Sequence, residues 1–434
     1  MSPFHARPTG MQPVLRRWLR AALALGAALS GAGVQAQIQA PAPGPLAGQT
    51  VRIAFIDPLS GPMADIGRNS LRSWVFMAER KSGPGNPAGV RFKVAGFDNK
   101  GSPQESLNVL KVAIDQGFRY IVQGHSSGAA AALSEAVTRH NTQYPDRAIL
   151  FINYAAMDPA LTNEQCSFWH FRIDADTTMK VRALTRYLAQ QPELERVHLL
   201  NQNYVHGQQL SRHFRKELES QQGRLKVVGD ELHPPFQVES FEPYVQRIRD
   251  SGAQAVVTGN WGEDMRRLVQ AMQKVGLDLP LYGYYPGLTG TPTELARAKT
   301  TMPVVQVSYH HTNQEPPAAQ LMAAFRQRYG EDLVALASYD GLEMLGQAMH
   351  RIGSTDPARV AGRLSGMIFQ SFSGPVQIRA DDHQLLKGLY ISRWQKTTDV
   401  FPVGAEGTDH TFVPVQFLPG SQISGPTTCA MQRP

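Results

Sequence analysis

Short apolar runs alternate with longer stretches of helical spacing along most of this 434-residue chain. Strands that alternate with helices favour right-handed crossovers and a parallel sheet, so the pattern predicts an α/β fold. In the first series, strands are expected at Val51–Asp57, Val90–Asp98, Tyr120–Gln123, Ala148–Asn153 and Phe168–Ile173, and helices from about Gly67 and at Pro103–Gln116 and Ala129–His140.

A second series of the same kind follows Asp174, which predicts two α/β units of similar size. Its expected helices are Thr178–Gln190, Gly207–Gln221, Tyr244–Ser251 and Glu263–Val275, and its expected strands are Val197–Asn201, Lys226–Glu231, Ala255–Asn260, Leu279–Tyr284 and Val304–His311. Three further helices, at Ala318–Tyr329, Leu333–Ile352 and Pro357–Met367, are expected before late strands at Gly374–Ile378 and Gly388–Trp394.

The first 36 residues have the features of a secretory signal peptide. A basic segment with Arg16, Arg17 and Arg20 accompanies an apolar stretch that ends near Leu29 and is too short to span a bilayer. The small-x-small sequence at 34–36 predicts cleavage there and export to the periplasm. No cysteine follows the apolar stretch, so a lipid anchor is not expected.

Residues 37–50 are rich in Pro, Gly and Ala and are expected to form a flexible leader, and Met11 is an alternative start. Four arginines of the signal account for more than half of the net charge of +7. Because no basic run with interleaved aromatics follows, a nucleic-acid partner is not expected. No later segment holds 18 consecutive apolar residues, so direct membrane insertion is not expected either.

The chain contains two cysteines, Cys166 and Cys429. An even number in an exported protein favours a disulfide, and two buried thiols are the alternative.

Two turns are candidates for a functional site. The turn Leu59–Pro62 follows a buried strand, at the sheet edge where α/β proteins bind ligands. The segment Gly124–Gly128 matches the G-x-S-x-G nucleophile elbow of hydrolases and lies between a strand and a helix. No later segment marks the acid and histidine that an elbow requires, so a ligand-binding turn at a helix N-terminus is the other interpretation.

Four segments in order resemble the type I periplasmic solute-binding proteins of ATP-driven importers, in the branch of the leucine/isoleucine/valine-binding protein. They are I-D-P-L-S-G-P-M-A-D-I-G at 56–67, I-N-Y-A-A-M-D-P-A-L-T at 152–162 with C-S-F-W-H-F-R at 166–172, L-N-Q-N-Y-V-H-G-Q-Q at 200–209, and A-S-Y-D-G-L-E-M-L-G-Q-A-M at 337–349.

The resemblance implies two doubly wound parallel-sheet lobes, joined by three crossing segments, that close on a small molecule. The first lobe is then expected to comprise 51–173 with 309–373, and the second lobe 174–308 with 374–415; a tail at 416–434 returns to the first lobe. The crossings are expected near 172–175, 307–311 and 372–376, an arrangement with which a Cys166–Cys429 bridge is consistent.

The resemblance also implies the ligand-binding residues. In the first lobe, Ser126, Ser127 and nearby N–H groups would hold a ligand carboxylate together with Ala155 and Ala156. The expected aromatic residues around the ligand are Tyr154, Tyr204, His206, Trp261 and Tyr285, for each of which core packing is the alternative.

The positions that depart from the branched-chain binder include Met157 and Tyr285. Met157 stands in place of a Thr, and Tyr285 stands in place of the Glu that pairs the α-ammonium of an amino acid. A buried ammonium without an anion is costly. Either Asp98, Glu263 or Asp264 takes over this role, or the ligand is an aromatic or aliphatic carboxylate without an ammonium.

The sequence therefore predicts a periplasmic receptor, without catalysis, cofactor or metal, that delivers an amino acid or a small carboxylate to the permease of an ABC importer. It is expected to be a monomer. The alternatives are a ligand sensor that feeds a regulator and a serine hydrolase built on Gly124–Gly128.

Overall fold

A computed structural model of the chain describes residues 44–221, 223–308, 318–371 and 374–434. The signal peptide expected at 1–36 and most of the leader expected at 37–50 lie outside these ranges. Within them, no helix is both long and apolar enough to cross a membrane.

The first lobe contains a five-stranded parallel sheet of order β2-β1-β3-β4-β5. Its strands are β1 (Thr50–Asp57), β2 (Arg91–Asp98), β3 (Tyr120–Gln123), β4 (Leu150–Asn153) and β5 (His170–Arg172), and the intervening helices are α1 (Ala64–Arg80), α2 (Pro103–Asp115) and α3 (Ser127–Gln143). Every residue of β3 and β4 is buried, as is typical of parallel strands covered on both faces.

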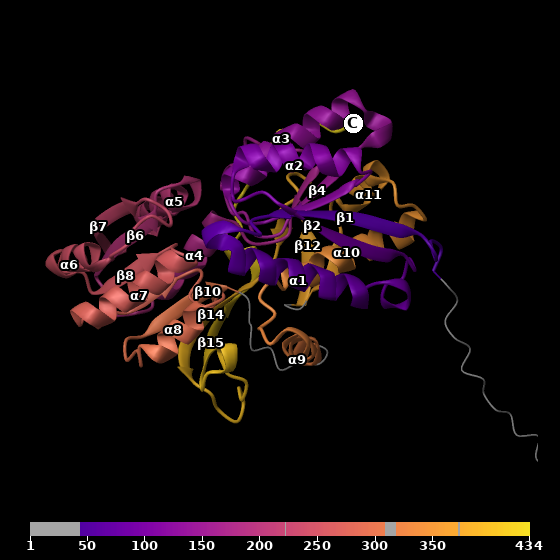
Figure 1. Cartoon of the computed structure of the whole chain (residues 1–434). Coiled ribbons are helices and arrows are strands. Elements are labelled where there is room, and N and C mark those ends of the chain that lie inside the picture. Colours follow the sequence, from indigo (N-terminus) through magenta and orange to yellow (C-terminus); the bar gives the residue numbers. More distant parts are fainter. Residues whose placement is uncertain (1–43, 222, 309–317, 372–373) are drawn as a thin grey trace, which may run out of the picture. The chain divides into compact units, whose positions relative to one another are not determined.

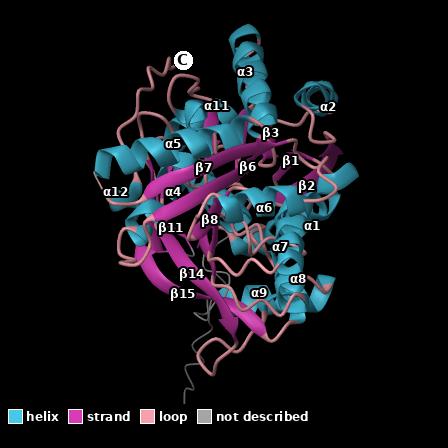
Figure 2. Cartoon of the chain, turned by 90° about the vertical axis from the view of Figure 1, so that its left-hand side faces the viewer, coloured by secondary structure: helices cyan, strands magenta, loops and turns pink. Residues whose placement is uncertain are grey.

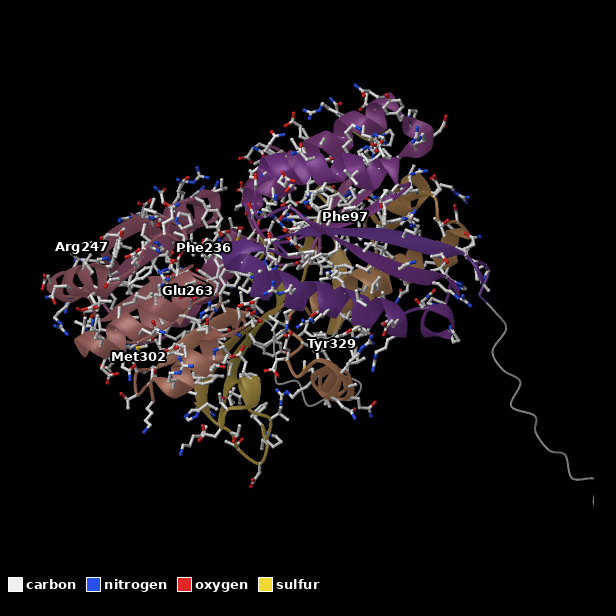
Figure 3. The ribbon with its side chains drawn as sticks, in the orientation of Figure 1. Phe97, Phe236, Arg247, Glu263, Met302 and Tyr329 are labelled. Carbon is white, nitrogen blue, oxygen red and sulfur yellow. A yellow bond between two sulfur atoms is a disulfide. The ribbon has the colours of Figure 1, made fainter. Side chains whose placement is uncertain are left out.

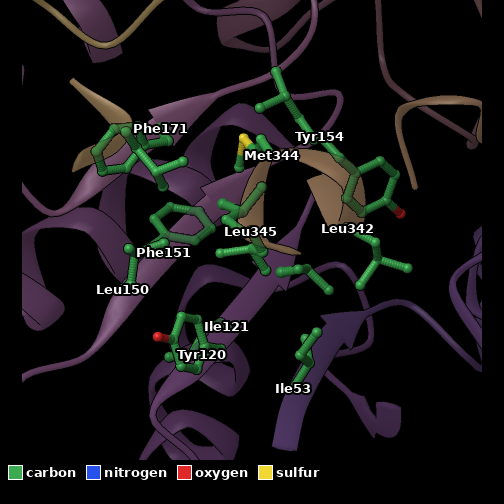
Figure 4. Packing of buried hydrophobic residues seen from close by; sticks show 14 of the residues in the cluster. Ile53, Tyr120, Ile121, Leu150, Phe151, Tyr154, Phe171, Leu342, Met344 and Leu345 are labelled. Carbon is green, nitrogen blue, oxygen red and sulfur yellow. The ribbon is translucent and has the colours of Figure 1, made fainter. Parts of the chain in front are cut away.

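Helices from the C-terminal half of the chain complete this lobe. They are α9 (Ala318–Tyr329), α10 (Ala337–Ile352) and α11 (Pro357–Leu364). Figure 1 shows α10 and α11, in orange, beside the indigo and magenta strands of the sheet. Leu342 and Leu345 of α10 belong to the same buried cluster as Ile53, Phe151 and Phe171 (Figure 4). The first lobe is thus assembled from both halves of the chain around one core.

The second lobe contains a seven-stranded sheet of order β15-β14-β10-β9-β8-β6-β7. The strands are β6 (Arg196–Gln202), β7 (Lys226–His233), β8 (Ala255–Thr258), β9 (Leu281–Gly283), β10 (Val304–Ser308), β14 (Leu389–Lys396) and β15 (His410–Leu418). The helices are α4 (Thr177–Leu188), α5 (Val205–Gln221), α6 (Glu242–Asp250), α7 (Glu263–Val275), α8 (Thr291–Arg297) and α12 (Gly420–Ile423) (Figure 2). Strands β6 to β10 pair in parallel, and β14 and β15 add an antiparallel edge beside β10.

The chain returns to the second lobe later in the sequence than expected, because a small antiparallel sheet precedes the return. This sheet consists of β11 (Ile368–Ser371), β12 (Gly374–Ile378) and β13 (Leu385–Leu386). Val376, Ile378 and Leu385 pack in the core of the first lobe, because alternate residues of β12 face that core. The segment 374–386 therefore packs with the first lobe, whereas the sequence placed it in the second, and the chain crosses back after Leu386 rather than at 372–376.

The first crossing follows Arg172, whose side chain is completely buried. Its Nε donates to Gln384 Oε1 at 2.6 Å, its Nη1 donates to the carbonyl of Asp158 at 2.5 Å, and its Nη2 lies 3.3 Å from Asp176 Oδ2. The guanidinium thus ties the end of β5 to the start of α4 and to the segment near 384. The crossing expected at 307–311 lies partly outside the described residues.

The C-terminal tail returns to the first lobe, and a disulfide joins Cys166 to Cys429 with their Cα atoms 5.8 Å apart. This bond excludes the alternative of two free thiols. Thr427 Oγ1 also donates to the carbonyl of Thr162 at 2.9 Å. The return begins later than the expected residue 416, because β15 extends to Leu418 and Ile423 packs in the second-lobe core.

The sequence did not predict β11, β13, β15, α8 or α12. In β15, Pro414 interrupts an apolar run, and proline argues against a strand interior. The structure accommodates it where the pairing between β14 and β15 shifts register, opposite Ser392. Most other predicted elements match to within a few residues.

Candidate functional site

One cavity between the two lobes is lined by all ten residues that the sequence predicts to contact a ligand. They are Ser126, Ser127, Tyr154, Ala155, Ala156, Met157, Tyr204, His206, Trp261 and Tyr285. Each follows the carboxyl end of β3, β4, β6, β8 or β9, the edge at which open α/β sheets bind ligands. The empty volume is about 850 Å³ including the part open to solvent, within the range of small-molecule sites.

The turn between β3 and α3 forms the first-lobe wall of this cavity. Ser126 adopts a φ of +86°, which non-glycine residues seldom do, and its Oγ accepts from the N–H of Ala129 at 3.3 Å as the N-cap of α3. The side-chain amide of Gln123 donates to the carbonyl of His125 at 2.5 Å. The N–H groups of the first turn of α3 have no acceptor within the helix, so this end of the helix favours an anion.

A buried carboxyl group supports the same turn from below. Asp57, the last residue of β1, accepts from the N–H of His125 at 2.9 Å and from the N–H of Gly124 at 3.1 Å. The hydroxyl of Tyr154 donates to Asp57 Oδ2 at 2.5 Å. Burial raises the pKa of Asp57 to about 8, although its hydrogen bonds act in the opposite direction.

The segment after β4 presents less backbone to the cavity than expected. The N–H groups of Ala155 and Ala156 donate to Asn153 Oδ1 at 3.2 and 2.7 Å. The carbonyl of Met157 accepts from the N–H of Thr177 at the start of α4. The two alanine N–H groups are therefore already occupied by Asn153, although both residues line the cavity.

Aromatic rings from both lobes meet across the cavity. Trp261 lies nearly parallel to His125, with ring centroids 5.9 Å apart, and its Nε1 donates to the hydroxyl of Tyr204 at 2.9 Å. Phe236, labelled in Figure 3, packs edge-to-face on Trp261 at 5.0 Å. Burial lowers the pKa of His125 to about 4, so this ring is neutral at neutral pH.

Two positions that depart from the branched-chain pattern touch each other. The hydroxyl of Tyr285 lies 3.1 Å from the sulfur of Met157, which joins the second lobe to the first. The ring of His206 lies edge-on to Tyr285 at 5.7 Å. Burial, and then the charge of Lys180, lower the pKa of His206 to about 4.

The cavity also contains an ion pair that the sequence did not predict. Lys180 Nζ lies 3.2 Å from Asp174 Oδ2, and both residues line the cavity and are buried. Nearby, Lys387 Nζ lies 3.3 Å from Asp340 Oδ2. Asp174 lies at the first crossing, and Lys180 lies in the first turn of α4. Charged residues beside the predicted crossing could therefore have indicated this ion pair from the sequence.

Residues 50–399 match the model of a family described as periplasmic binding protein. The chain belongs to this family. The Leu/Ile/Val-binding protein homolog 4 of Brucella melitensis is 26% identical over 403 residues, which cover 89% of this chain and 94% of the relative. The match confirms the family predicted from the sequence.

Solved structures confirm the two-lobe α/β fold. The leucine-, isoleucine-, valine-, threonine- and alanine-binding protein of Brucella ovis, in a closed conformation, has a TM-score of 0.76 at 23% identity, covering 89% of this chain and 100% of that chain. A solute-binding protein of an ABC transporter from Rhodopseudomonas palustris BisB5, in complex with 3,4-dihydroxybenzoic acid, has a TM-score of 0.71 at 18% identity, covering 86% and 98%.

In this periplasmic binding protein, none of the three acids considered for an ammonium lines the cavity. Asp98 accepts from the N–H of Leu59 at 2.8 Å and from the hydroxyl of Ser60 at 2.5 Å. Glu263 pairs with the guanidinium groups of Arg266 and Arg267. Asp264 accepts from the amide of Gln202 and from the N–H of Phe236. Each carboxylate is engaged elsewhere.

The turn Leu59–Pro62, a candidate site in the sequence, does not line the cavity either. Its hydroxyl and one N–H are used by Asp98, which holds the turn against the end of β2. The end of β1 contributes to the site through Asp57, which supports the turn between β3 and α3. Sequence reasoning missed this role, because residue type does not distinguish a buried carboxyl from an exposed one.

Proposed function

We propose that this periplasmic binding protein is the substrate-binding receptor of an ABC importer and captures a small carboxylate that carries no ammonium group. The single observation behind this choice is the charge balance of the cavity. Its acid, Asp174, already accepts from Lys180 and from the N–H of Ala175 at 2.7 Å. A ligand ammonium placed beside Asp174 would face the like charge of Lys180.

An anion finds more favourable partners. The first turn of α3 offers N–H groups and the positive end of its dipole, and the hydroxyl of Ser127 lies beside them. The rings of Tyr154, Trp261 and Tyr285 line the rest of the cavity and suit a flat ring or an apolar chain. Relatives of the same fold include both a Leu/Ile/Val-binding protein homolog and a protein in complex with a dihydroxybenzoic acid.

In this proposal the ligand docks on the first lobe at Ser126, Ser127 and the Ala155–Met157 segment. The second lobe closes with Trp261, His206 and Tyr285. The closed form delivers the ligand to a permease in the membrane, while another subunit hydrolyses ATP. The chain itself acts in the periplasm as a monomer after removal of its signal peptide, without catalysis or cofactor.

A thermal-shift series tests the ligand class with benzoate, 4-hydroxybenzoate, hexanoate, L-leucine and L-phenylalanine. A ligand at 100 times its Kd adds about 2.7 kcal/mol of stability, so true ligands raise the Tm clearly. We expect the acids to stabilise the protein and the amino acids to have little effect. Stabilisation by the amino acids alone would refute the charge argument. Trp261→Ala should weaken the successful ligand at least tenfold, and Phe417→Ala, on the exposed face of β15, serves as a control.

The two other functions are distinguished by separate outcomes. A hydrolase would turn over esters and lose that activity with Ser126→Ala; here Ser126 Oγ caps α3. The His125 ring hydrogen-bonds to Ser70 Oγ at 3.1 Å rather than to Ser126, which favours binding. A sensor would bind a regulator instead of a permease. A pull-down with the purified permease complex distinguishes the two, because only a transport receptor binds that complex.

A further inference from the structure

Asp57 is buried beneath the ligand cavity without lining it. Its two oxygens accept from two successive backbone N–H groups, those of Gly124 and His125, and from the hydroxyl of Tyr154. The amide of Gln123 lies 3.4 Å from the same carboxyl. These four groups belong to the end of β3, the following turn and the residue after β4, so one carboxyl joins three strand ends.

Hydrogen bonds continue from Asp57 to the cavity wall. Tyr154 lies between Asp57 and Ser70 of α1, with which its hydroxyl also interacts. Ser70 Oγ lies 3.1 Å from His125 Nε2, and the His125 ring stacks on Trp261 of the second lobe. A change at Asp57 therefore reaches Ser70, His125 and the contact between the lobes through groups in direct contact.

The turn that Asp57 holds is closely packed and contains one unfavourable backbone conformation. Ser126 adopts a left-handed φ that costs free energy for a residue with a side chain. Gly124 lies so close to the Tyr154 ring that an added Cβ would come within 2.7 Å of it. The close approach of Gly124 packs the turn against the Tyr154 ring, and Asp57 accepts from the hydroxyl of Tyr154.

We propose that Asp57 positions the Gly124–Ser127 turn of the ligand cavity, and that protonation of its carboxyl strengthens the binding of an anionic ligand by this turn. This inference rests on the proposed function, in which that turn holds the ligand. A neutral carboxyl still accepts the two N–H groups and donates its proton to the Tyr154 hydroxyl, which then donates to Ser70. An ionised carboxyl instead places a negative charge near the ligand carboxylate and repels it.

The titratable groups around Asp57 leave this carboxyl as the one that changes charge near neutral pH. Burial raises its pKa to about 8. Tyr154 and His125 face it from β4 and from the turn; burial raises the pKa of Tyr154 well above 10 and lowers the pKa of His125 to about 4. Asp98, its register partner in β2, has a lowered pKa and faces Leu59 and Ser60.

The first experiment measures amide hydrogen exchange of the ligand-free protein and compares Asp57→Asn with Asp98→Asn. Asp98 is a matched control, because it ends the neighbouring strand and accepts backbone N–H groups, but those of Leu59 and Lys100 rather than those of Gly124 and His125. We expect Asp57→Asn to speed exchange at Gly124 and His125 by at least tenfold, and Asp98→Asn to leave these two amides unchanged. Equal rates at these amides in wild type and Asp57→Asn would overturn the proposal.

The second experiment measures the Kd of 4-hydroxybenzoate by calorimetry from pH 6 to pH 9, with L-leucine as a second probe. In wild type we expect the Kd of the acid to rise roughly tenfold between pH 7 and pH 9, the effect of one like charge nearby. Asp57→Asn should bind more weakly at pH 7 and show a flat profile, while Asp98→Asn should follow wild type. A flat wild-type profile would refute the role of protonation.

Failure of the ligand class and failure of the positioning role are distinguishable. If neither probe binds wild type, the proposed ligand is wrong, and the exchange rates alone decide the role of Asp57. If Asp57→Asn does not fold, Tyr154→Phe replaces it, since this variant keeps the ring and removes the hydroxyl that Asp57 holds. Faster exchange at Gly124 in Tyr154→Phe supports the proposal, and unchanged exchange there contradicts it.

Discussion

At the scale of single residues, the ligand class that we propose depends on the absence of a charged side chain at Tyr285. Its hydroxyl contacts Met157 across the lobes, and it brings no charge to the cavity. We expect Tyr285→Glu to add an anion, to weaken benzoate-type acids at least tenfold and to improve the binding of L-leucine. Tyr285→Gln is the matched control, since it has the same shape as the Glu variant without its charge. Equal affinities of the two variants in calorimetry would show that charge at this position is irrelevant.

Sequence reasoning identified the residues that line the cavity better than those that support it. Ser127, Trp261 and Tyr285 were found because strand ends mark the site and the family pattern marks the positions. Asp57 and Asp174 were missed, because their importance lies in burial and in partners that come together only on folding. The same limit explains why Asp264 was an attractive anion in the sequence, while the structure commits it to Gln202.

At the scale of elements, the start of α4 combines a helix cap with the first crossing. Asp176 accepts from the N–H of Met179 at 2.8 Å and also pairs with the buried Arg172. Asp176→Ala removes the cap and one charge partner of a buried guanidinium, so we expect a loss of about 3–5 kcal/mol. Asp356→Ala, which removes the cap of α11 from the N–H of Arg359 and a partly exposed ion pair with Arg119, should cost only about 1 kcal/mol.

Urea midpoints of the two variants check this difference. Similar losses would mean that Arg172 keeps enough partners without Asp176, namely Gln384 and the carbonyl of Asp158. The segment that crosses between the lobes is hard to predict. The helix cap at Asp176 can be recognised in the sequence, whereas its pairing with Arg172 depends on the burial of β5.

At the scale of the whole molecule, the disulfide closes a loop with a sequence separation of 263 between Cys166 and Cys429. Cross-linking so long a loop restricts the unfolded chain, and the expected loss on removal is roughly 2–5 kcal/mol. We expect reductant to lower the guanidinium midpoint of wild type to that of the Cys166→Ser/Cys429→Ser variant and to leave the variant unchanged. A wild-type midpoint that does not respond to reductant would contradict this expectation.

The stability of the molecule should pass through a maximum near pH 7, because two sets of buried groups act in opposite directions. Burial lowers the pKa of His125, His206 and His383 to about 4, below the ordinary 6.5. The unfolded chain then binds more protons between pH 4 and 6.5, so stability rises with pH in that range. Asp57 has the opposite sign: with its pKa raised from 3.8 to about 8, the folded chain binds the extra proton, and stability falls as pH rises to 8.

Above about pH 7 the histidines of the unfolded chain lose most of their protons, and the Asp57 contribution alone falls by about 1 kcal/mol between pH 7 and 8. Urea unfolding at half-unit intervals from pH 5 to 9 measures it. Asp57→Asn should remove this decline while keeping the rise at lower pH, and His206→Gln should reduce the rise without affecting the decline. A decline that persists unchanged in Asp57→Asn would assign it to another group, and the difference between the two profiles isolates this one carboxyl from every other titrating group in the chain.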